Sequence, residues 1–231
     1  MTLKAVLFDF NGVIINDEPI HKQLIDEILL EENIRPLDKE YKKICLGRSD
    51  RFCLLELFQF YGRVVSENYL NQIMHRKARR YQEQISNLET LPIYPGLKEL
   101  LIKLEELNLK LAIVSGALRS EIEIVLTRSE LKNYFSVIVG GDEIQVSKPA
   151  PDGYLLAVER LNQQEPNLHL SPAQCLIIED SLPGMQAGKN AQMNVIGIAH
   201  TYPLHILQRQ ANWAVDSFAD IDLSEIMQKF T

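Results

Sequence analysis

Short apolar runs recur along the chain, and polar residues follow each of them. The first run covers residues 5–8 and stops at a carboxylate, Asp9, which the turn formers Asn11 and Gly12 follow closely. Unbroken apolar runs of this length are typical of strands that are buried on both faces of a parallel sheet. Further runs of this kind cover residues 109–114, 135–139, 175–178 and 194–199.

From residue 90 onward the apolar runs alternate with segments whose apolar residues recur at helical spacing. These helical segments cover residues 97–107, 121–126, 153–161 and 184–191. Such alternation is typical of a parallel sheet with right-handed crossovers. The pattern therefore predicts an α/β fold with a Rossmann-like parallel sheet as its core.

The stretch between the first two predicted strands contains no convincing buried strand. Ile20, Leu24 and Ile28 recur at four-residue intervals, which is a helical spacing. The helices predicted here cover residues 20–30, 38–46, 51–60 and 66–85. We therefore expect a core domain of residues 1–16 and 89–231, with an all-helical cap domain of residues 17–88 inserted into it.

Charge narrows the range of partners. The chain has 231 residues, of which 46% are hydrophobic and 24% are charged, as in an ordinary globular protein. Its net charge of −7 argues against nucleic acid and anionic membranes as partners. Three basic residues of the last cap helix, Lys77, Arg79 and Arg80, are interpreted as a solvated helix face.

The cysteines indicate a reducing compartment. Cys45, Cys53 and Cys175 form no C-x-x-C pair, and we interpret them as reduced packing residues of a cytoplasmic protein. Asp9 and Asn11 interrupt the N-terminal apolar run, and no small-residue cleavage site follows, so no signal peptide is predicted. No run reaches the roughly 18 apolar residues of a membrane span. We expect a monomer with no membrane partner.

Polar residues that could take part in catalysis or ligand binding lie just past the predicted strands or in a loop next to one. Each has an ordinary alternative, such as a turn, a helix cap or a solvated loop charge. However, the carboxyl ends of parallel strands open on one edge of a sheet, so these residues should converge. They are Asp9 with Asn11, Ser115 with Gly116, Lys148, and Glu179 with Asp180.

The converging residues suit phosphoryl transfer. A carboxylate such as Asp9 can accept a phosphoryl group as an aspartyl phosphate. Mg²⁺ prefers hard oxygen ligands, which Asp9 and Asp180 can supply, with Glu179 binding directly or through water. Ser115 and the backbone at Gly116 can hold phosphate oxygens, and Lys148 can neutralise the remaining charge.

The chain resembles the haloacid dehalogenase superfamily, in particular the subgroup of β-phosphoglucomutase and phosphoglycolate phosphatase with a helical cap after the first strand. The resemblance covers nearly the whole chain. It rests on the segments 9–13 (DFNGV), 147–152 (SKPAPD) and 178–181 (IEDS) and on Ser115 at a strand end.

The resemblance implies a role for each site residue. Asp9 would be the nucleophile, and Asp180 with the backbone carbonyl of Asn11 would complete a Mg²⁺ site. Ser115 and Lys148 would hold the phosphoryl group. Residues 16–21 resemble the hinge into the cap, and residues 47–49 resemble the cap loop that reaches the substrate. Candidate substrate-binding residues on this side are His21, Arg48 and Arg51.

One position departs from the family pattern. The phosphatases carry aspartate two residues after the nucleophile, where it protonates the leaving group and then activates water. Asn11 can do neither, although its backbone carbonyl still suits the metal, and His21 is the other nearby candidate for proton transfer. General acid–base help of this kind contributes typically ~10²–10⁴-fold. The superfamily's dehalogenases also lack this aspartate but need no Mg²⁺, and the Glu179–Asp180 pair argues against that branch.

Two functions follow from these observations. The first is a Mg²⁺-dependent phosphatase or phosphomutase that acts on a small phosphorylated metabolite, such as a sugar phosphate. The second is a phosphate-ligand binding protein that retains the site and has lost its acid–base group. A phospho-accepting receiver domain fits less well, because the acidic pair lies on a late strand and the helical insert has no place in it.

Overall fold

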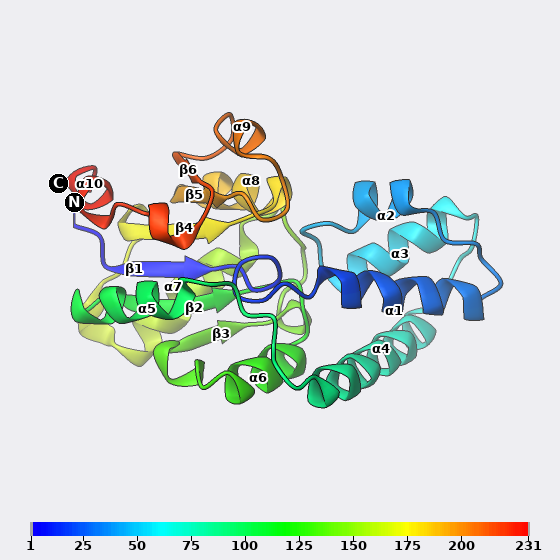
Figure 1. Ribbon diagram of the computed structural model, residues 1–231. Helices are drawn as coiled ribbons and strands as arrows, with labels where there is room; N and C mark the ends of the chain where they lie inside the picture. The colour runs from blue at the N-terminus through cyan, green and yellow to red at the C-terminus, as the bar shows by residue number, and fades with distance from the viewer. Residues whose placement is uncertain (1, 231) are drawn as a thin grey trace.

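The fold is built on one parallel sheet, which a computed structural model describes within residues 2–230 (Figure 1). The six strands follow the order β3-β2-β1-β4-β5-β6. Their bounds are β1 Ala5–Phe8, β2 Lys110–Val114, β3 Val137–Val139, β4 Cys175–Glu179, β5 Asn194–Ile198 and β6 Trp213–Val215. The first strand of the chain is central, because β1 pairs in parallel with both β2 and β4.

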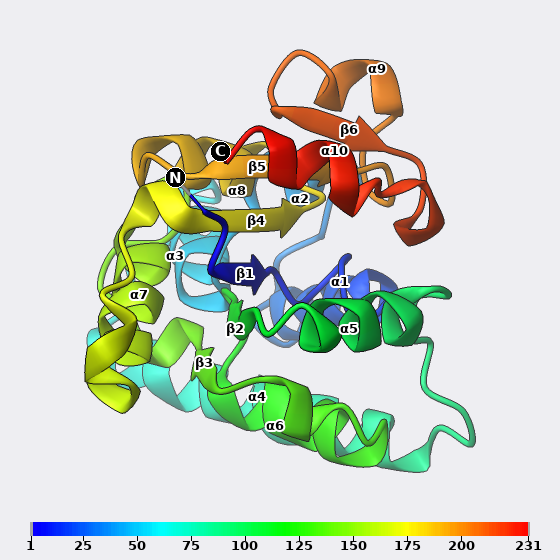
Figure 2. The ribbon, with the colours of Figure 1, turned by 90° about the vertical axis from the view of Figure 1, so that its left-hand side faces the viewer.

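Helices cover both faces of the sheet because the apolar strands present side chains alternately to each face. On one face, Val6 and Phe8 of β1 pack with α5 (Leu97–Glu106), α6 (Arg119–Arg128) and α10 (Leu223–Gln228). On the other, Ala5 and Leu7 pack with α7 (Asp152–Gln164), α8 (Leu182–Asn190) and α9 (Leu204–Leu207). Figure 2 shows α5 and α7 on opposite sides of the strands.

Four further helices form a bundle beyond the carboxyl ends of the strands (Figure 1). They are α1 (Glu18–Glu31), α2 (Asp38–Ile44), α3 (Asp50–Phe60) and α4 (Glu67–Asn87). The bundle has its own apolar cluster, which includes Ile28, Leu54 and Ile73. None of the helices described within residues 2–230 is both long and apolar enough to cross a bilayer.

The two segments that join the bundle to the sheet run side by side. The Asn16 amide donates to the Pro92 carbonyl at 2.8 Å, and the Tyr94 amide donates to the Ile14 carbonyl at 3.2 Å. An antiparallel bridge between Ile15 and Ile93 lies between these bonds. The bundle is therefore joined to the sheet by two segments of the chain that pair with each other.

The predicted strands and helices are present, with shifted ends. The third strand begins at Val137 rather than at residue 135, because residues Lys132–Tyr134 form a 3-10 turn that ends just before it. The sequence patterns gave no prediction for β6, α9 and α10, which follow residue 199.

The interpretation of the cysteines was wrong for two of them. Cys45 and Cys53 form a disulfide, with Cα atoms 4.7 Å apart, and Cys175 is free and buried in β4. The turn between α2 and α3 brings the pair together, and that turn could not be derived from the cysteine spacing.

Candidate active site

The predicted strand-end residues meet at the carboxyl edge of the sheet. Asp9 follows β1, Ser115 and Gly116 follow β2, and Asp180 follows β4. Together with residues of the helical bundle, this edge encloses a cavity of about 50 Å³. The residues that line this cavity include Asp9, Asn11, Glu18, His21, Tyr41, Arg48, Asp50, Gly116, Lys148, Asp180 and Thr201.

Lys148 joins the two acidic strand ends. Its ammonium lies 2.7 Å from Asp9 Oδ1 and 2.6 Å from Glu179 Oε1, and it also donates to the Val114 carbonyl at 3.3 Å. All three charged side chains are buried. Burial raises the pKa of Asp9 to about 7, although the Lys148 ammonium acts against this shift. Burial thus works against ionisation of Asp9, whereas the ion pair with Lys148 favours it at the edge of the cavity.

Glu179 is held firmly by donors on both carboxylate oxygens. Oε1 accepts from Lys148, and the Tyr154 hydroxyl lies 3.3 Å from the same oxygen. Oε2 accepts from the backbone amides of Asp180 and Ser181 at 3.0 and 2.9 Å and from the Ser181 hydroxyl at 2.9 Å. Because both oxygens are occupied, Glu179 acts mainly as the anchor of Lys148 and of the turn that carries Asp180.

Asp180 packs against the turn after β1. Gly12 has φ +78, and a Cβ atom there would lie 2.0 Å from Asp180 Oδ2, so only glycine fits. The Thr201 hydroxyl donates to the same oxygen. Burial, and then the charges of Glu179 and Asp9, raise the pKa of Asp180 well above its ordinary value.

The three buried carboxylates are suited to a divalent cation. Carboxylate oxygens of Asp9, Glu179 and Asp180 all lie within 4.8 Å of one another. Lys148 supplies one positive charge against three negative ones, so the ionised cluster has an excess of two negative charges. A hard divalent cation such as Mg²⁺ prefers such oxygen ligands and would neutralise that excess.

The Asn11 side chain is oriented by partners at both ends. Its Oδ1 lies 3.3 Å from the Ser115 hydroxyl, which also accepts a bond from the Ala117 amide at 3.0 Å. Its Nδ2 donates to the two oxygens of Asp17 at 3.0 and 2.9 Å. The amide thus links the predicted phosphate-binding serine to a buried carboxylate at the start of α1.

Asp17 is the centre of a buried hydrogen-bond network. Besides Asn11, it accepts from the Tyr81 hydroxyl at 2.5 Å, and His21 Nε2 lies 3.2 Å away. Burial alone would raise the pKa of Asp17, but His21, Tyr81 and Asn11 outweigh it and lower the pKa below its ordinary value. Asp17 is therefore an ionised carboxylate next to Asn11, the position at which the sequence resemblance implies an acid–base aspartate.

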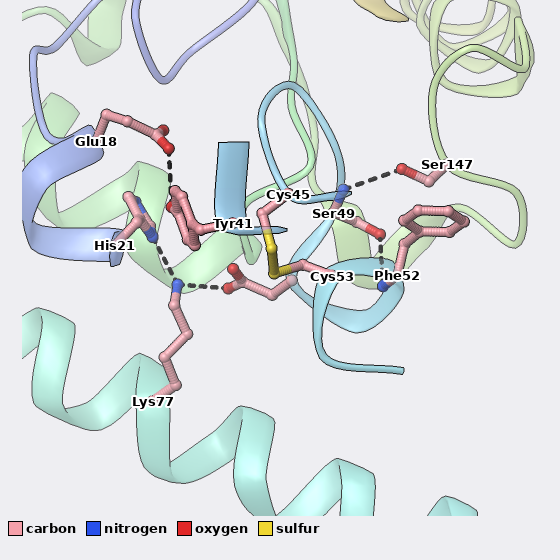
Figure 3. Close-up of a disulfide and its surroundings, with 10 residues drawn as sticks. Glu18, His21, Tyr41, Cys45, Ser49, Phe52, Cys53, Lys77 and Ser147 are labelled. Carbon is pink, nitrogen blue, oxygen red and sulfur yellow. Dashed lines mark hydrogen bonds and ion pairs between the residues drawn. A yellow bond between two sulfur atoms is a disulfide. The ribbon is translucent and has the colours of Figure 1, made fainter. Parts of the chain in front are cut away.

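Lys77 connects this network to the sheet domain. Its ammonium lies 2.6 Å from His21 Nδ1 (Figure 3), and it also lies 2.5 Å from Asp50 and 3.3 Å from Glu121. Because Lys77 donates to Nδ1, the His21 proton is assigned to Nε2, which lies 3.2 Å from Asp17 Oδ2 and 2.9 Å from Asn11 Nδ2. Lys77 is 0% exposed. Its interpretation as part of a solvated face was therefore wrong, whereas Arg79 is exposed.

The two candidate arginines, Arg48 and Arg51, lie at different cavities. The Arg48 guanidinium stacks over the Phe52 ring at 4.3 Å and lines the cavity. Among the ion pairs found within residues 2–230, none involves Arg48. Arg51 instead pairs with Glu67 and Asn71 and lines a different cavity. The structure thus brings Arg48, but not Arg51, to the site.

Comparison with known proteins places this geometry in a family. The model of the family described as haloacid dehalogenase-like hydrolase matches residues 6–198. The chain belongs to this family. The matched region contains every strand-end residue discussed above, from Asp9 to Asp180.

Relatives of this haloacid dehalogenase-like hydrolase include phosphatases and a mutase. β-Phosphoglucomutase of Bacillus subtilis is 31% identical over 206 residues, which cover 87% of this chain and 86% of the relative. A phosphorylated carbohydrates phosphatase of Thermotoga maritima is 28% identical over 203 residues, with 86% and 87% covered. The solved β-phosphoglucomutase of Clostridium difficile has a TM-score of 0.85 at 23% identity, covering 99% of this chain and 97% of that one, which shows a shared fold.

Sequence reasoning missed several polar residues around the site of this hydrolase. Asp17 was considered as part of the hinge of residues 16–21, yet its side chain makes no capping bond and turns to Asn11. Lys77 occupies the apolar stripe of α4 between buried Ile73 and Tyr81, and this periodicity was the available signal. Asp50, Glu121 and Thr201 carried no signal, because their partners are distant in sequence.

Proposed function

We propose that this hydrolase is a Mg²⁺-dependent phosphatase or phosphomutase that acts on a small phosphorylated carbohydrate through an aspartyl phosphate on Asp9. The observation that carries the proposal is the buried Asp9 carboxylate held by Lys148 beside the acidic pair. The names of its relatives support the substrate class. A carboxylate oxygen of Asp9 would attack phosphorus, and the bond from phosphorus to the ester oxygen would break.

The residues around Asp9 supply positioning and charge. Lys148 already bonds to Asp9, so its ammonium lies where phosphoryl oxygens would arrive. The Ser115 hydroxyl and the backbone of Gly116 offer donors on the other side of the transferred group. Phosphoryl transfer depends chiefly on positioning and electrostatic stabilisation of this kind.

Asp9, Asp180 and the backbone carbonyl of Asn11 would hold the metal ion. Glu179 would act through water, because its oxygens already accept from Lys148, Ser181 and the backbone. When bound, Mg²⁺ neutralises charge on the phosphoryl oxygens of the substrate.

Asn11 sets a limit on turnover. Its amide has no proton to give to a leaving group, and its two ends are committed to Ser115 and Asp17. Both the expulsion of an alkoxide and the later hydrolysis of the aspartyl phosphate would lack acid–base help. We therefore expect aryl phosphates, with their better leaving groups, to react faster than alkyl phosphates, and the aspartyl phosphate to accumulate. A second candidate function rests on the same residue, namely a phosphate-ligand binding protein.

Residues 17–88 would move as one unit over the site. The paired connection at Ile15 and Ile93 supports a single hinge, and a cavity of about 50 Å³ is too small to exchange a sugar phosphate without opening. Magnesium with a metal fluoride should protect the backbone amides of residues 47–51 from hydrogen exchange. Unchanged exchange there would show that this loop does not reach the ligand.

The function is tested with a panel of small phosphate esters, with and without Mg²⁺. We expect phosphate release, or isomerisation for a mutase, that requires Mg²⁺ and is lost in Asp9→Asn. Acid quenching should trap phosphate on Asp9 of the wild type. If no ester reacts while phosphate analogues still bind in calorimetry, the protein is a binding module.

A further inference from the structure

The disulfide lies at the base of the loop that contacts the carboxyl edge of the sheet. Cys45 follows the last residue of α2, and Cys53 lies in the first turn of α3. Residues 46–52 lie between them. This segment, which includes residues 47–49, is called the cap loop. Both cysteines line the same cavity as Asp9 and Lys148. Figure 3 shows the bridge beside Tyr41 and Ser49 at the lower end of this loop.

The cap loop contacts the sheet domain next to the site residues. The Ser49 amide donates to the Ser147 hydroxyl at 3.0 Å. A Cβ atom on Gly47 would lie 2.4 Å from the Ser181 hydroxyl oxygen, and one on Gly116 would lie 2.8 Å from the Arg48 carbonyl oxygen. Ser147, Ser181 and Gly116 directly adjoin Lys148, Asp180 and Ser115 in the sequence. The position of the loop is therefore matched closely to the three segments that carry the phosphate and metal residues.

Residues 46–49 have few other bonds within the loop, whereas Asp50 and Arg51 are in α3 and are held by Lys77 and Glu67. The Ser49 hydroxyl caps α3 by accepting from the Phe52 amide at 3.3 Å, and the Arg48 amide donates to the Cys45 carbonyl at 2.9 Å. The disulfide is the covalent link that closes the two ends, which are 8 residues apart. Opening this link would return backbone freedom to the loop.

We propose that Cys45–Cys53 is a thiol–disulfide exchange site that controls the order of the cap loop and, through it, the affinity for substrate. This proposal rests on the proposed function. A dithiol reductant, as a thiolate, attacks one sulfur of the bridge and forms a mixed disulfide. Its second thiol then attacks the mixed disulfide, so that the reductant forms its own internal disulfide. Two electrons and two protons pass to the protein, which gains two cysteine thiols, and the reductant leaves as a disulfide. The state of the bridge would then follow the supply of dithiol reductant.

The loop acts on binding more than on chemistry. The bridged loop already has the shape that fits against residues 116, 147 and 181, whereas an open loop must be ordered when substrate binds. Reduction should therefore raise KM at least about fivefold, the cost of ordering the backbone of a single loop residue, while kcat changes by less than about twofold. Restoration of the bridge by oxidised dithiol should return KM to its starting value.

The experiment compares oxidised and reduced wild type with two variants. Cys45→Ala/Cys53→Ala should show the high KM in both redox conditions. Cys175→Ala, which removes the free thiol in β4, should respond to reductant like the wild type. Alkylation of the denatured protein followed by mass spectrometry counts free thiols in each sample, and one thiol is expected in the oxidised wild type. Three free thiols after incubation with oxidised dithiol, or equal KM values in both states, would overturn the proposal.

A measurement that needs no turnover separates this proposal from the proposed function. Hydrogen exchange of residues 46–52 is followed in oxidised and reduced protein. Faster exchange on reduction supports control of the loop by the bridge, even if no ester is hydrolysed. Equal exchange refutes it, even if the protein proves to be an active phosphatase.

Discussion

The substitution Asn11→Asp tests how the site handles protons. It places a carboxyl group where the Asn11 amide now donates to Asp17 at 3.0 and 2.9 Å. Two full charges 3 Å apart repel by about 5.5 kcal/mol at an effective dielectric constant of 20. That repulsion raises the pKa of whichever carboxyl ionises second. The pair would therefore keep one proton at neutral pH instead of ionising fully.

The retained proton should restore turnover. A protonated carboxyl beside the cavity can protonate a leaving group, so we expect kcat to rise by at least about tenfold, the low end of general acid help. Because the pair keeps one proton, its net charge equals that of the wild-type contact, so kcat/KM should rise together with kcat. Phosphate release from a panel of alkyl phosphates measures both constants.

The same proton makes stability depend on pH. The shared carboxyl has a pKa in the folded state above its unfolded value of about 4, so the folded form is destabilised as pH rises between the two values. Urea unfolding should show Asn11→Asp close to the wild type at pH 4 and progressively weaker towards pH 8. The loss approaches but does not exceed the repulsion energy above.

The matched control exchanges the two side chains. Asn11→Asp/Asp17→Asn keeps one carboxyl and one amide at this contact, so it should avoid the loss of stability at high pH. Its single carboxylate at position 11 is ionised at neutral pH, so it can assist only the hydrolysis of the aspartyl phosphate, and turnover should rise less than in Asn11→Asp. If the wild type turns over rapidly and neither variant changes kcat, proton transfer does not pass through position 11, and the reasoning fails.

Further predictions concern the metal, the buried lysine and the bridge. Asp180→Ala should lose most Mg²⁺ affinity in calorimetry, and unchanged affinity would remove Asp180 from the metal site. In the wild type, Mg²⁺ affinity should rise with pH through about 7, because burial raises the pKa of Asp9 to about 7 and the metal binds the ionised form; a flat profile from pH 6 to 8 would contradict this. Lys77→Met leaves Asp50 and Glu121 without their cation and should cost about 3–5 kcal/mol of unfolding free energy, whereas the exposed Arg79→Ala should stay within about 0.5 kcal/mol. Opening the Cys45–Cys53 bridge, whose ends are 8 residues apart, should lower the unfolding free energy by about 2.5 kcal/mol in the chain-entropy treatment, and equal urea midpoints with and without reductant would refute that figure.

The sequence pattern was clearest for those strands and helices that are most deeply buried. The strands β1, β2 and β4 are buried almost throughout, so each reads as an unbroken apolar run. β6 has three half-buried residues at the edge of the sheet, and α9 has four residues, so neither leaves a periodic pattern. The same reason explains the site, because residues that end buried strands could be located from those strands.

The network around Asn11 and Lys77 could not be predicted in the same way. Its contacts join Asp17 to Tyr81 and Lys77 to Asp50 and Glu121, which lie on separate helices. No spacing rule connects such positions, because the packing of helices that are distant in sequence creates the contacts. The cysteine pair has the same character, since the turn between two short helices determines it.

The central position of β1 has a consequence for synthesis of the chain. This strand leaves the ribosome first, but it needs β2 on one side and β4 on the other, and β4 ends only at Glu179. The helices α1–α4 contact one another locally and can assemble while β1 still waits for both neighbours. Leu7 and Phe8, fully buried in the finished fold, are therefore exposed in the nascent chain until most of it has been made. Demand for chaperones during translation should thus depend on the N-terminal strand more than on any later segment.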